Sequence, residues 1–521
     1  MARIFTLGFG IIILVYVISS FKKEPSVGEL LAESFENEIY DEFDTLAFDS
    51  VFTKTLDSLS TKLSDFQSIK TFYTKNGYCP TLVIRFYKSK NLDVLLNFLQ
   101  NSTVHGFDPE RFSTTEFRSL LGYFKGNNEF NNVSQSYSAL AKLELLSANA
   151  YIKYINYLKF GVVNPQKVFS RYFINVKRPD VQSTIRLLNS GSMSDTLVSV
   201  QGKSLQYMAL QSAFIKAEND SVRRTLAVNM ERLRWILPQT GEDYVQVNIP
   251  DFTLIYFKQR DTLTTMKVCV GSKADDDYEK KMDVFKKTGD YDDKPNNHET
   301  PILFSSITLL YVNPVWNIPE SIVKKEIYPM ARRNSSYLRR NDINVYHKNK
   351  LVNNPAGIRW SRYDVEKLPF LFVQRPGIKN SLGKFKFAFE NNSSIFLHDT
   401  NNKKAFKQSN RAISHGCIRL EQPLKFAELL VGDKDKCDKL RSDIGLVPIN
   451  KNNLAGYHMK RSHKLTSKDS QLTPSVYTPK KSVPLLITYF TAWEMNNKIE
   501  YRPDVYGLDK DLWAAMNKIN R

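Results

Sequence analysis

The hydrophobic period of the chain changes once, near Tyr244, and this change constrains the fold more than any other feature. Before it, residues 56–230 repeat apolar residues at steps of three and four, a spacing typical of amphipathic helices. After it, the segments 244–249, 252–257 and 264–270 alternate or run apolar between turn residues, which predicts consecutive strands. We therefore predict an α+β protein with a helical N-terminal domain and a β-rich C-terminal domain.

The same pattern sets the expected domain limits. We place a membrane anchor or signal segment at 1–22, a linker at 23–55, a helical scaffold domain at 56–230 and a β-rich domain at 231–521. Further strands are expected at 301–314, 383–399 and 483–493, and loops at 273–297 and 451–482. A basic insertion at about 323–368 interrupts the strands, and insertions of this length are often lids or substrate clamps.

The N-terminus carries an uncharged run, Ile4–Phe21, between Arg3 and the pair Lys22-Lys23. Its 18 residues approach the roughly 20 that a spanning helix needs, and exceed the roughly 7–15 of a signal-peptide core. We see no small-x-small cleavage site, so we expect an uncleaved inner-membrane anchor; a cleaved signal and a buried core helix are the alternatives. Basic residues on both sides leave the orientation open. Either targeting reading places the bulk of the chain in the periplasm or cell envelope.

The net charge limits the partners. The chain has 73 Lys+Arg against 54 Asp+Glu, a balance of +19 that favours nucleic acid, anionic lipid or an acidic wall polymer. Because export separates the chain from nucleic acid, we expect no nucleic-acid partner.

The cysteines single out one position. None of the four lies in a C-x-x-C pair, so neither a zinc ribbon nor a thioredoxin-like site is indicated. Three of them, Cys79, Cys269 and Cys437, are most simply interpreted as small buried apolar residues. Cys417 differs because His398, His415 and Arg419 lie within twenty residues of it.

Two short segments carry the chemistry, His398-Asp399-Thr400 and Ser414–Arg419. An imidazole or a positive charge near a cysteine favours its thiolate, the nucleophilic form. If the first segment is a strand and the second begins another element, a return loop places His398 against Cys417. Gly416 allows a tight turn whose amides face a developing oxyanion. Arg419 shares the face of Cys417 in extended chain, where it favours the thiolate or holds a substrate carboxylate.

Two alternatives stay open at this point. A zinc site of His398, His415 and Cys417 lacks an evident fourth ligand. Asp399 either orients His398 or serves a turn, since neighbours on a strand point to opposite faces.

The spacing from His398 through fifteen residues to Ser414-His415-Gly416-Cys417-Ile418-Arg419 resembles the signature of the L,D-transpeptidase catalytic domain, a β-rich fold of cysteine acyltransferases that cross-link peptidoglycan. Other segments resemble the large, scaffold-bearing branch of that family: 104–112, 157–165, 229–235, 247–254, 270–272, 300–304, 312–322, 374–387, 411–421 and 483–507. The resemblance covers about residues 55–515 and is weaker before residue 220. The interval 181–221 is short for the peptidoglycan-binding module that larger members carry, so we expect no complete module.

The resemblance implies roles for the motif residues. Cys417 is the nucleophile, acylated by a donor tetrapeptide stem at the carbonyl of its third residue, a diamino acid, with loss of the terminal D-alanine. His398 activates it, and His415 shapes the oxyanion region. Ser414, Gly416 and Arg419 complete the pocket, Arg419 on a substrate carboxylate.

The resemblance also implies the partners. An acceptor amine, or water, then takes the acyl group, an amine of a second stem giving a 3→3 cross-link. No cofactor or metal is implied, and carbapenems are the expected inhibitors. Tyr346, Arg359 and Trp360 are expected to cap the substrate, with plain surface positions as the alternative. An exported L,D-carboxypeptidase and an inert wall-binding protein are the rival functions.

Overall fold

The computed structural model describes residues 24–126, 131–202, 204–289, 293–458 and 472–518. The apolar run Ile4–Phe21 therefore lies outside the described residues. Within these ranges, no helix is both long enough and apolar enough to cross a membrane. The chain divides into two compact units, an N-terminal unit of residues 1–103, 108–155 and 180–200 and a C-terminal unit of residues 104–107, 156–179 and 201–521.

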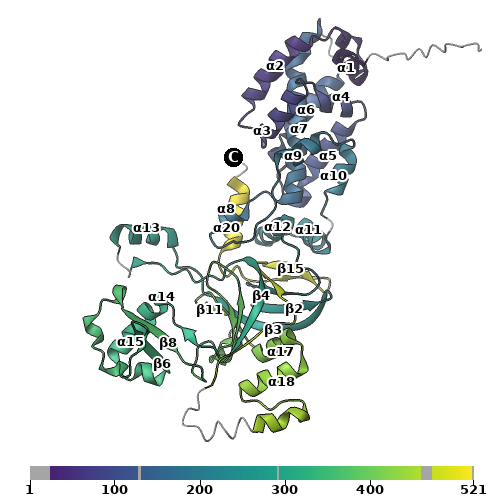
Figure 1. The fold of residues 1–521 in the computed structure, drawn as a ribbon. Helices are drawn as coiled ribbons and strands as arrows, with labels where there is room; N and C mark the ends of the chain where they lie inside the picture. The colour runs from purple at the N-terminus through teal and green to yellow at the C-terminus, as the bar shows by residue number, and fades with distance from the viewer. Residues whose placement is uncertain (1–23, 127–130, 203, 290–292, 459–471, 519–521) are drawn as a thin grey trace, which may run out of the picture. The chain divides into compact units, whose positions relative to one another are not determined.

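Helices make up the N-terminal unit, as the apolar spacing predicts (Figure 1). In the middle of α7 (Tyr137–Phe160), Glu144 is fully buried and accepts hydrogen bonds from Tyr73 Oη at 2.6 Å and from the amides of Leu82 and Val83 at 2.9 and 2.8 Å. These amides begin α4 (Thr81–Phe86), which has no cap from its own N-cap side chain, so Glu144 caps it. The other α-helices of the unit are α1 (Val27–Phe35), α2 (Thr45–Ser58), α3 (Phe66–Lys75), α5 (Asn91–Gln100), α6 (Thr114–Lys125), α9 (Val181–Leu188) and α10 (Met193–Ser199).

The segment 23–55 is not the linker that the sequence suggested. It holds α1 and most of α2, and its Leu31, Phe48 and Phe52 are fully buried. Acidic residues on the exposed faces of these helices lower the apolar content of the segment and hide its helical period. The expected domain limits themselves stay predictions.

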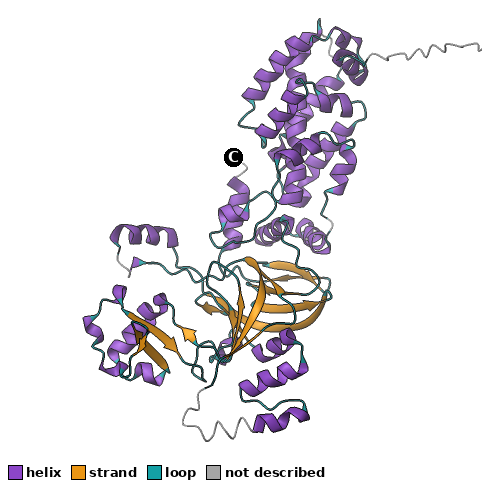
Figure 2. Ribbon diagram, viewed as in Figure 1, coloured by secondary structure: helices purple, strands orange, loops and turns teal. Residues whose placement is uncertain are grey.

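The strands all belong to the C-terminal unit (Figure 2). Ten of them form one sheet, in the order β11-β3-β12-β10-β9-β4-β14-β1-β2, and β13 pairs with β4. The last strand of this order, β2, also pairs with β3, so the sheet closes on itself. The strands are β1 (Tyr244–Asn248), β2 (Thr253–Lys258), β3 (Asp261–Gly271), β4 (Leu303–Val312), β9 (Phe385–Phe389), β10 (Leu397–His398), β11 (Ala412–Ser414), β12 (Ile418–Leu420), β13 (Ser475–Tyr477) and β14 (Val483–Thr488). This unit and the helical unit confirm the α+β prediction.

Helices cover this sheet. Phe426 of α17 (Pro423–Val431) lies 4.9 Å from Phe387 and 6.1 Å from Tyr256, between ring centroids, which places the helix on the sheet core. On α12 (Asp220–Arg234), Arg232 pairs with Asp509 of α20 (Leu508–Lys518) at 2.6 Å. This body also includes α8 (Pro165–Val168), α11 (Leu205–Lys216), α18 (Lys434–Asp443), β15 (Ala492–Met495) and β16 (Lys498–Tyr501).

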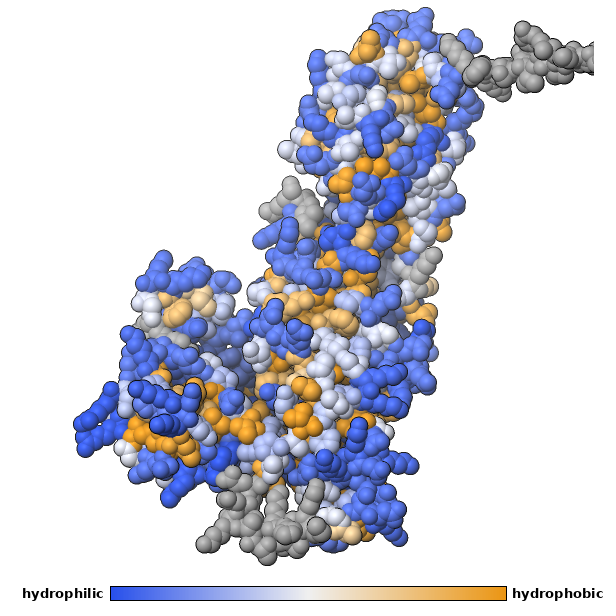
Figure 3. Space-filling view, in the orientation of Figure 1, coloured by the Kyte–Doolittle hydropathy of each residue, from blue (hydrophilic) through white to orange (hydrophobic). Residues whose placement is uncertain are grey.

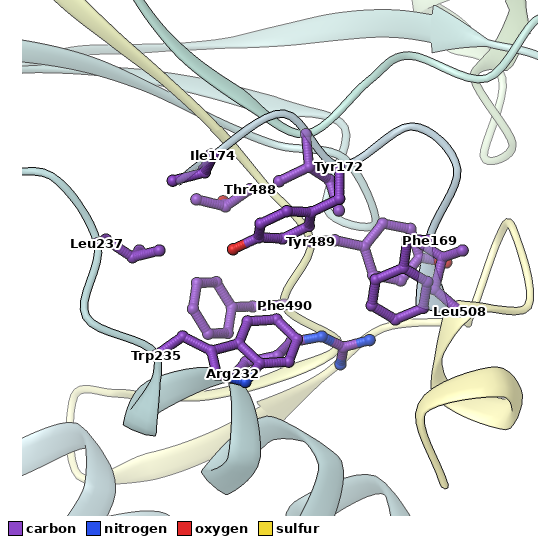
Figure 4. Close-up of a pocket in the computed structure, with 11 residues that line it drawn as sticks. Phe169, Tyr172, Ile174, Arg232, Trp235, Leu237, Thr488, Tyr489, Phe490 and Leu508 are labelled. Atoms are coloured by element: carbon purple, nitrogen blue, oxygen red, sulfur yellow. The ribbon is translucent and has the colours of Figure 1, made fainter. Parts of the chain in front are cut away.

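An aromatic cluster fixes the segment that leads into the sheet (Figure 4). Tyr172 forms an isolated parallel bridge with Ile302, just before β4, and its ring lies 5.6 Å from that of Trp235. The space between this cluster and Tyr489 is a cavity of only about 20 Å³, room for one water. The cluster is therefore part of the packing and not a ligand site.

The basic insertion at about 323–368 is part of a larger folded lobe, which extends from β5 to β8. Four strands in the order β5-β8-β6-β7 pack on short helices around a core that includes Leu338, Val345 and Phe372. Its elements are β5 (Trp316–Asn317), α14 (Glu320–Ile322), a π-helix (Val323–Ile327), α15 (Tyr328–Arg333), α16 (Tyr337–Arg340), β6 (Ile343–His347), β7 (Lys350–Leu351) and β8 (Phe370–Gln374). Hydrophilic side chains cover much of the lobe's visible surface (Figure 3). The expected loop at 273–297 also holds a helix, α13 (Tyr278–Thr288), with no buried residue.

Candidate active site

Two neighbouring strands bring His398 and Cys417 to one cavity. β10 pairs in parallel with β12, with Leu397 opposite Ile418 and His398 opposite Arg419, and Cys417 directly precedes β12. Residues 399–417 therefore form the return connection that the sequence predicts. His398 and Cys417 both line a cavity of about 850 Å³, and lobe residues between Val315 and Glu326 also line it. The lobe thus contributes to the lining of the cavity that contains Cys417.

Ser414 and Gly416 shape the loop that presents the thiol. Gly416 has φ of 110°, a conformation that an L side chain rarely adopts. The Ser414 hydroxyl donates to the Cys417 carbonyl at 2.5 Å and accepts from the Gly416 amide at 3.2 Å. The tight turn expected at Gly416 is confirmed, and Ser414 holds that turn closed.

Thr300 ties this loop to the sheet, a role that the sequence did not reveal. Its hydroxyl donates to the Gly416 carbonyl at 2.8 Å and accepts from the Gly271 amide at 2.8 Å. Tyr506 closes the network, since its hydroxyl accepts from the Thr300 amide at 3.2 Å and donates to the Gly271 carbonyl at 2.7 Å. Thr300 and Tyr506 stand far from Cys417 in sequence, so only the fold connects them to it.

Replacing Thr300 with valine is expected to lower the free energy of unfolding by about 1–3 kcal/mol, because it leaves the buried Gly271 amide and Gly416 carbonyl without their shared partner. All five tryptophans lie in the C-terminal unit, so tryptophan fluorescence during urea denaturation reports on this unit. The Thr300→Ser variant keeps the hydroxyl and should stay close to wild type. A loss in Thr300→Ser as large as that in Thr300→Val would contradict this assignment, because serine retains the hydroxyl that bonds to Gly271 and Gly416.

Burial and nearby cations set the protonation of the pair. Burial raises the pKa of the Cys417 thiol to about 11, although the Phe396 amide, Lys386 and Arg419 act in the opposite direction. Burial also lowers the pKa of His398 to about 3, and Arg419 and Lys386 add to this. At neutral pH the resting site therefore holds a thiol and a neutral imidazole, not an ion pair. His398 Nδ1 is buried and forms no hydrogen bond of ordinary geometry among the described residues, although the Asp399 backbone acts to raise the pKa of the ring.

The alkylation rate of Cys417 by iodoacetamide is expected to rise about tenfold per pH unit from pH 7 to pH 10, because only the thiolate reacts and its fraction grows until the raised pKa is reached. Peptide mass spectrometry of the alkylated Cys417 gives the rate, and a small free thiol in the same buffers gives the reference curve. A plateau already at neutral pH would contradict the neutral resting pair.

Asp399 is a turn residue. Its carboxylate accepts from the amides of Lys384 and Thr400 at 2.8 and 2.7 Å and pairs with Lys403. None of these contacts reaches the His398 ring. Of the two alternatives left by the sequence, the turn role is the one the geometry supports.

His415 faces the insertion lobe. Its Nε2 lies 2.7 Å from Glu326 Oε1, and its ring centroid lies 4.6 Å from that of His298. The hydrogen bond from His415 holds the pKa of the Glu326 carboxyl below its usual value. The sequence did not single out Glu326 or His298. Since Glu326 belongs to the lobe, His415 connects the Ser414–Cys417 loop to the lobe. Its expected part in the oxyanion region stays a prediction.

The three residues expected to cap the substrate are not among those that line the cavity. Trp360 is only 4% exposed and packs in the core of the lobe, where its ring lies 5.4 Å from that of Phe370. Arg359 is exposed, and Tyr346 lies half-buried on β6. Trp316, which does line the cavity, is the aromatic residue of the lobe that lies at the site.

Comparisons with known proteins match the part of the chain that contains this site. A family model described as the L,D-transpeptidase catalytic domain matches residues 242–439, and one described as a scaffold domain matches residues 67–214. A Haemophilus influenzae protein with the provisional name L,D-transpeptidase is 26% identical over 339 residues, which cover 64% of this chain and 59% of that protein. The chain thus spans less than two thirds of the relative's length. These matches confirm the resemblance drawn from the sequence.

Proposed function

We propose that the chain, whose residues 242–439 match the L,D-transpeptidase catalytic domain and whose residues 67–214 match a scaffold domain, forms 3→3 cross-links in peptidoglycan through an acyl-enzyme on Cys417. The observation that carries the proposal is that His398 on β10 and Cys417, directly before the neighbouring β12, line one cavity of about 850 Å³. A cavity of this size falls in the range of known ligand sites.

The proposed reaction has two halves. The Cys417 sulfur attacks the third-residue carbonyl of the donor stem, and His398 accepts the thiol proton and passes it to the departing D-alanine amine. The side-chain amine of an acceptor stem then attacks the thioester. That amine loses a proton through His398 as the peptide bond forms, and the Cys417 thiol is restored.

We also propose that the reaction takes place in the periplasm, with the chain held to the inner membrane by Ile4–Phe21. The support is the length of that uncharged run and the basic residues beside it. Fractionation of cells that make the full chain tests this, since a protein released by high salt would contradict the anchor.

Mass spectrometry of muropeptides, after incubation of the full protein with wall material rich in tetrapeptide stems, tests the reaction. We expect 3→3 dimers together with free D-alanine. Shortened stems without dimers would instead identify an L,D-carboxypeptidase, and unchanged muropeptides with protein bound to the wall would identify an inert binding protein.

A further inference from the structure

Two cations stand on either side of His398. Lys386 on β9 is its register partner on one side, and Arg419 on β12 is its register partner on the other. Residues directly opposite on neighbouring strands project from the same face of a sheet. All three side chains line the cavity that contains Cys417. The thiol therefore shares its cavity with a row of two cations and one neutral imidazole.

Among the residues that the structure describes, no carboxylate pairs with Lys386 or Arg419. The cavity is lined by two carboxylates, Glu326 and Glu390, and among the described residues neither forms an ion pair with Lys386 or Arg419. Glu326 is bonded to His415 and acts on Arg419 only at a distance.

The surroundings of Lys386 and Arg419 do little to offset the free-energy cost of burying their charges. Lys386 Nζ lies over the Phe396 ring at 4.2 Å from its centroid, and Arg419 Nε is buried without a hydrogen-bond partner. Half-buried cations without an anion are costly. This pair is therefore prepared for an anion that enters from outside.

We propose that Lys386, together with Arg419, binds a carboxylate of the donor stem beside Cys417. The identity of the donor rests on the function proposed above, and such a stem offers two carboxylates, on the terminal D-alanine and on the side chain of the diamino acid. An ammonium and a guanidinium fork together suit a carboxylate, the first as a point charge and the second through paired N–H groups.

Carboxylate binding would also prepare the base. Arg419 and Lys386 both lower the pKa of His398 in the empty site. An anion between them offsets their charge, so His398 accepts the Cys417 proton more readily once the donor is seated. The site then activates its nucleophile chiefly when a substrate is present.

Two alkylating agents of nearly equal size test the carboxylate site without any wall substrate. Iodoacetate carries a carboxylate and iodoacetamide an amide, while both react with the same thiolate. We define the ratio as the alkylation rate by iodoacetate divided by the alkylation rate by iodoacetamide. We expect this ratio to be larger at Cys417 than at a small free thiol. In Lys386→Met this ratio should fall about threefold to tenfold, the loss of one charge-assisted contact at a partly exposed group.

Matched variants separate binding from a change in the thiol. Lys386→Arg should retain the ratio, and Lys404→Met, which removes a lysine outside the cavity, should leave it unchanged. If Lys386→Met changes the alkylation rates of both reagents by the same factor, Lys386 acts on the thiol alone. That result would contradict the proposed carboxylate site.

Donor analogues identify which carboxylate binds. One tetrapeptide carries a C-terminal D-alanine amide, and another has lysine in place of the diamino acid. The analogue that lacks the bound carboxylate should acylate wild type more slowly than the parent peptide. With that analogue, Lys386→Met should cause no further loss of rate. If both analogues acylate wild type as fast as the parent, the carboxylate site fails while the proposed function stands. If no donor acylates wild type, the proposed function fails and the alkylation ratio still decides the role of Lys386.

Discussion

Replacing Cys417 with alanine is expected to abolish the covalent adduct that a carbapenem forms on the wild-type protein, and to lower cross-linking by about four orders of magnitude or more. The reason is that the sulfur is the atom that bonds to the acyl group, whereas the Ser414 hydroxyl, which also lines the cavity, donates to the Cys417 carbonyl. Intact-protein mass spectrometry detects the adduct, and muropeptide analysis detects the cross-links.

Cys437 provides the matched control for this prediction. It is also half-buried, but it lies on α18 with its thiol donating to the Glu428 carbonyl at 3.5 Å, and it does not line the cavity. Cys437→Ala should form the adduct as wild type does. An adduct that persists in Cys417→Ala, or that is lost in Cys437→Ala, would remove Cys417 from its proposed role.

Replacing His398 with glutamine is expected to slow acylation at neutral pH by about 10²–10⁴-fold, the usual contribution of a positioned general base. The resting thiol has a pKa of about 11, so almost no thiolate exists at neutral pH unless a base removes the proton during attack. Stopped-flow or quenched acylation by a tetrapeptide donor gives the rate.

Alkylation at high pH separates a missing base from a damaged site. Near pH 11 hydroxide forms the thiolate, so iodoacetamide should modify Cys417 in His398→Gln almost as fast as in wild type. His415→Gln provides the comparison, because His415 Nε2 is already bonded to Glu326. If the acylation rate falls more in His415→Gln than in His398→Gln, His415 and not His398 is the general base.

The sequence predicted the elements whose apolar period is strong. The strands β1, β2 and β3 and the helices α5 and α7 occur where alternation or helical spacing was clear. The prediction from the sequence was wrong in segments where only a few apolar residues form the core. The segment 23–55 became helical through Leu31, Phe48 and Phe52, and the polar insertion folded around a small core that includes Trp360. A core assembled from scattered residues leaves no regular period in the sequence.

The sequence by itself determined the α+β class and the motif that runs from His398 to Arg419, because spacing and residue type are local properties. Only the tertiary structure decided what surrounds the thiol: Lys386 beside His398, Thr300 behind Gly416, and Glu326 on His415. It also decided that Cys417 rests as a thiol and His398 as a neutral base. The physical reason is that strand pairing joins residues distant in sequence, and burial then sets the pKa of the groups that it encloses.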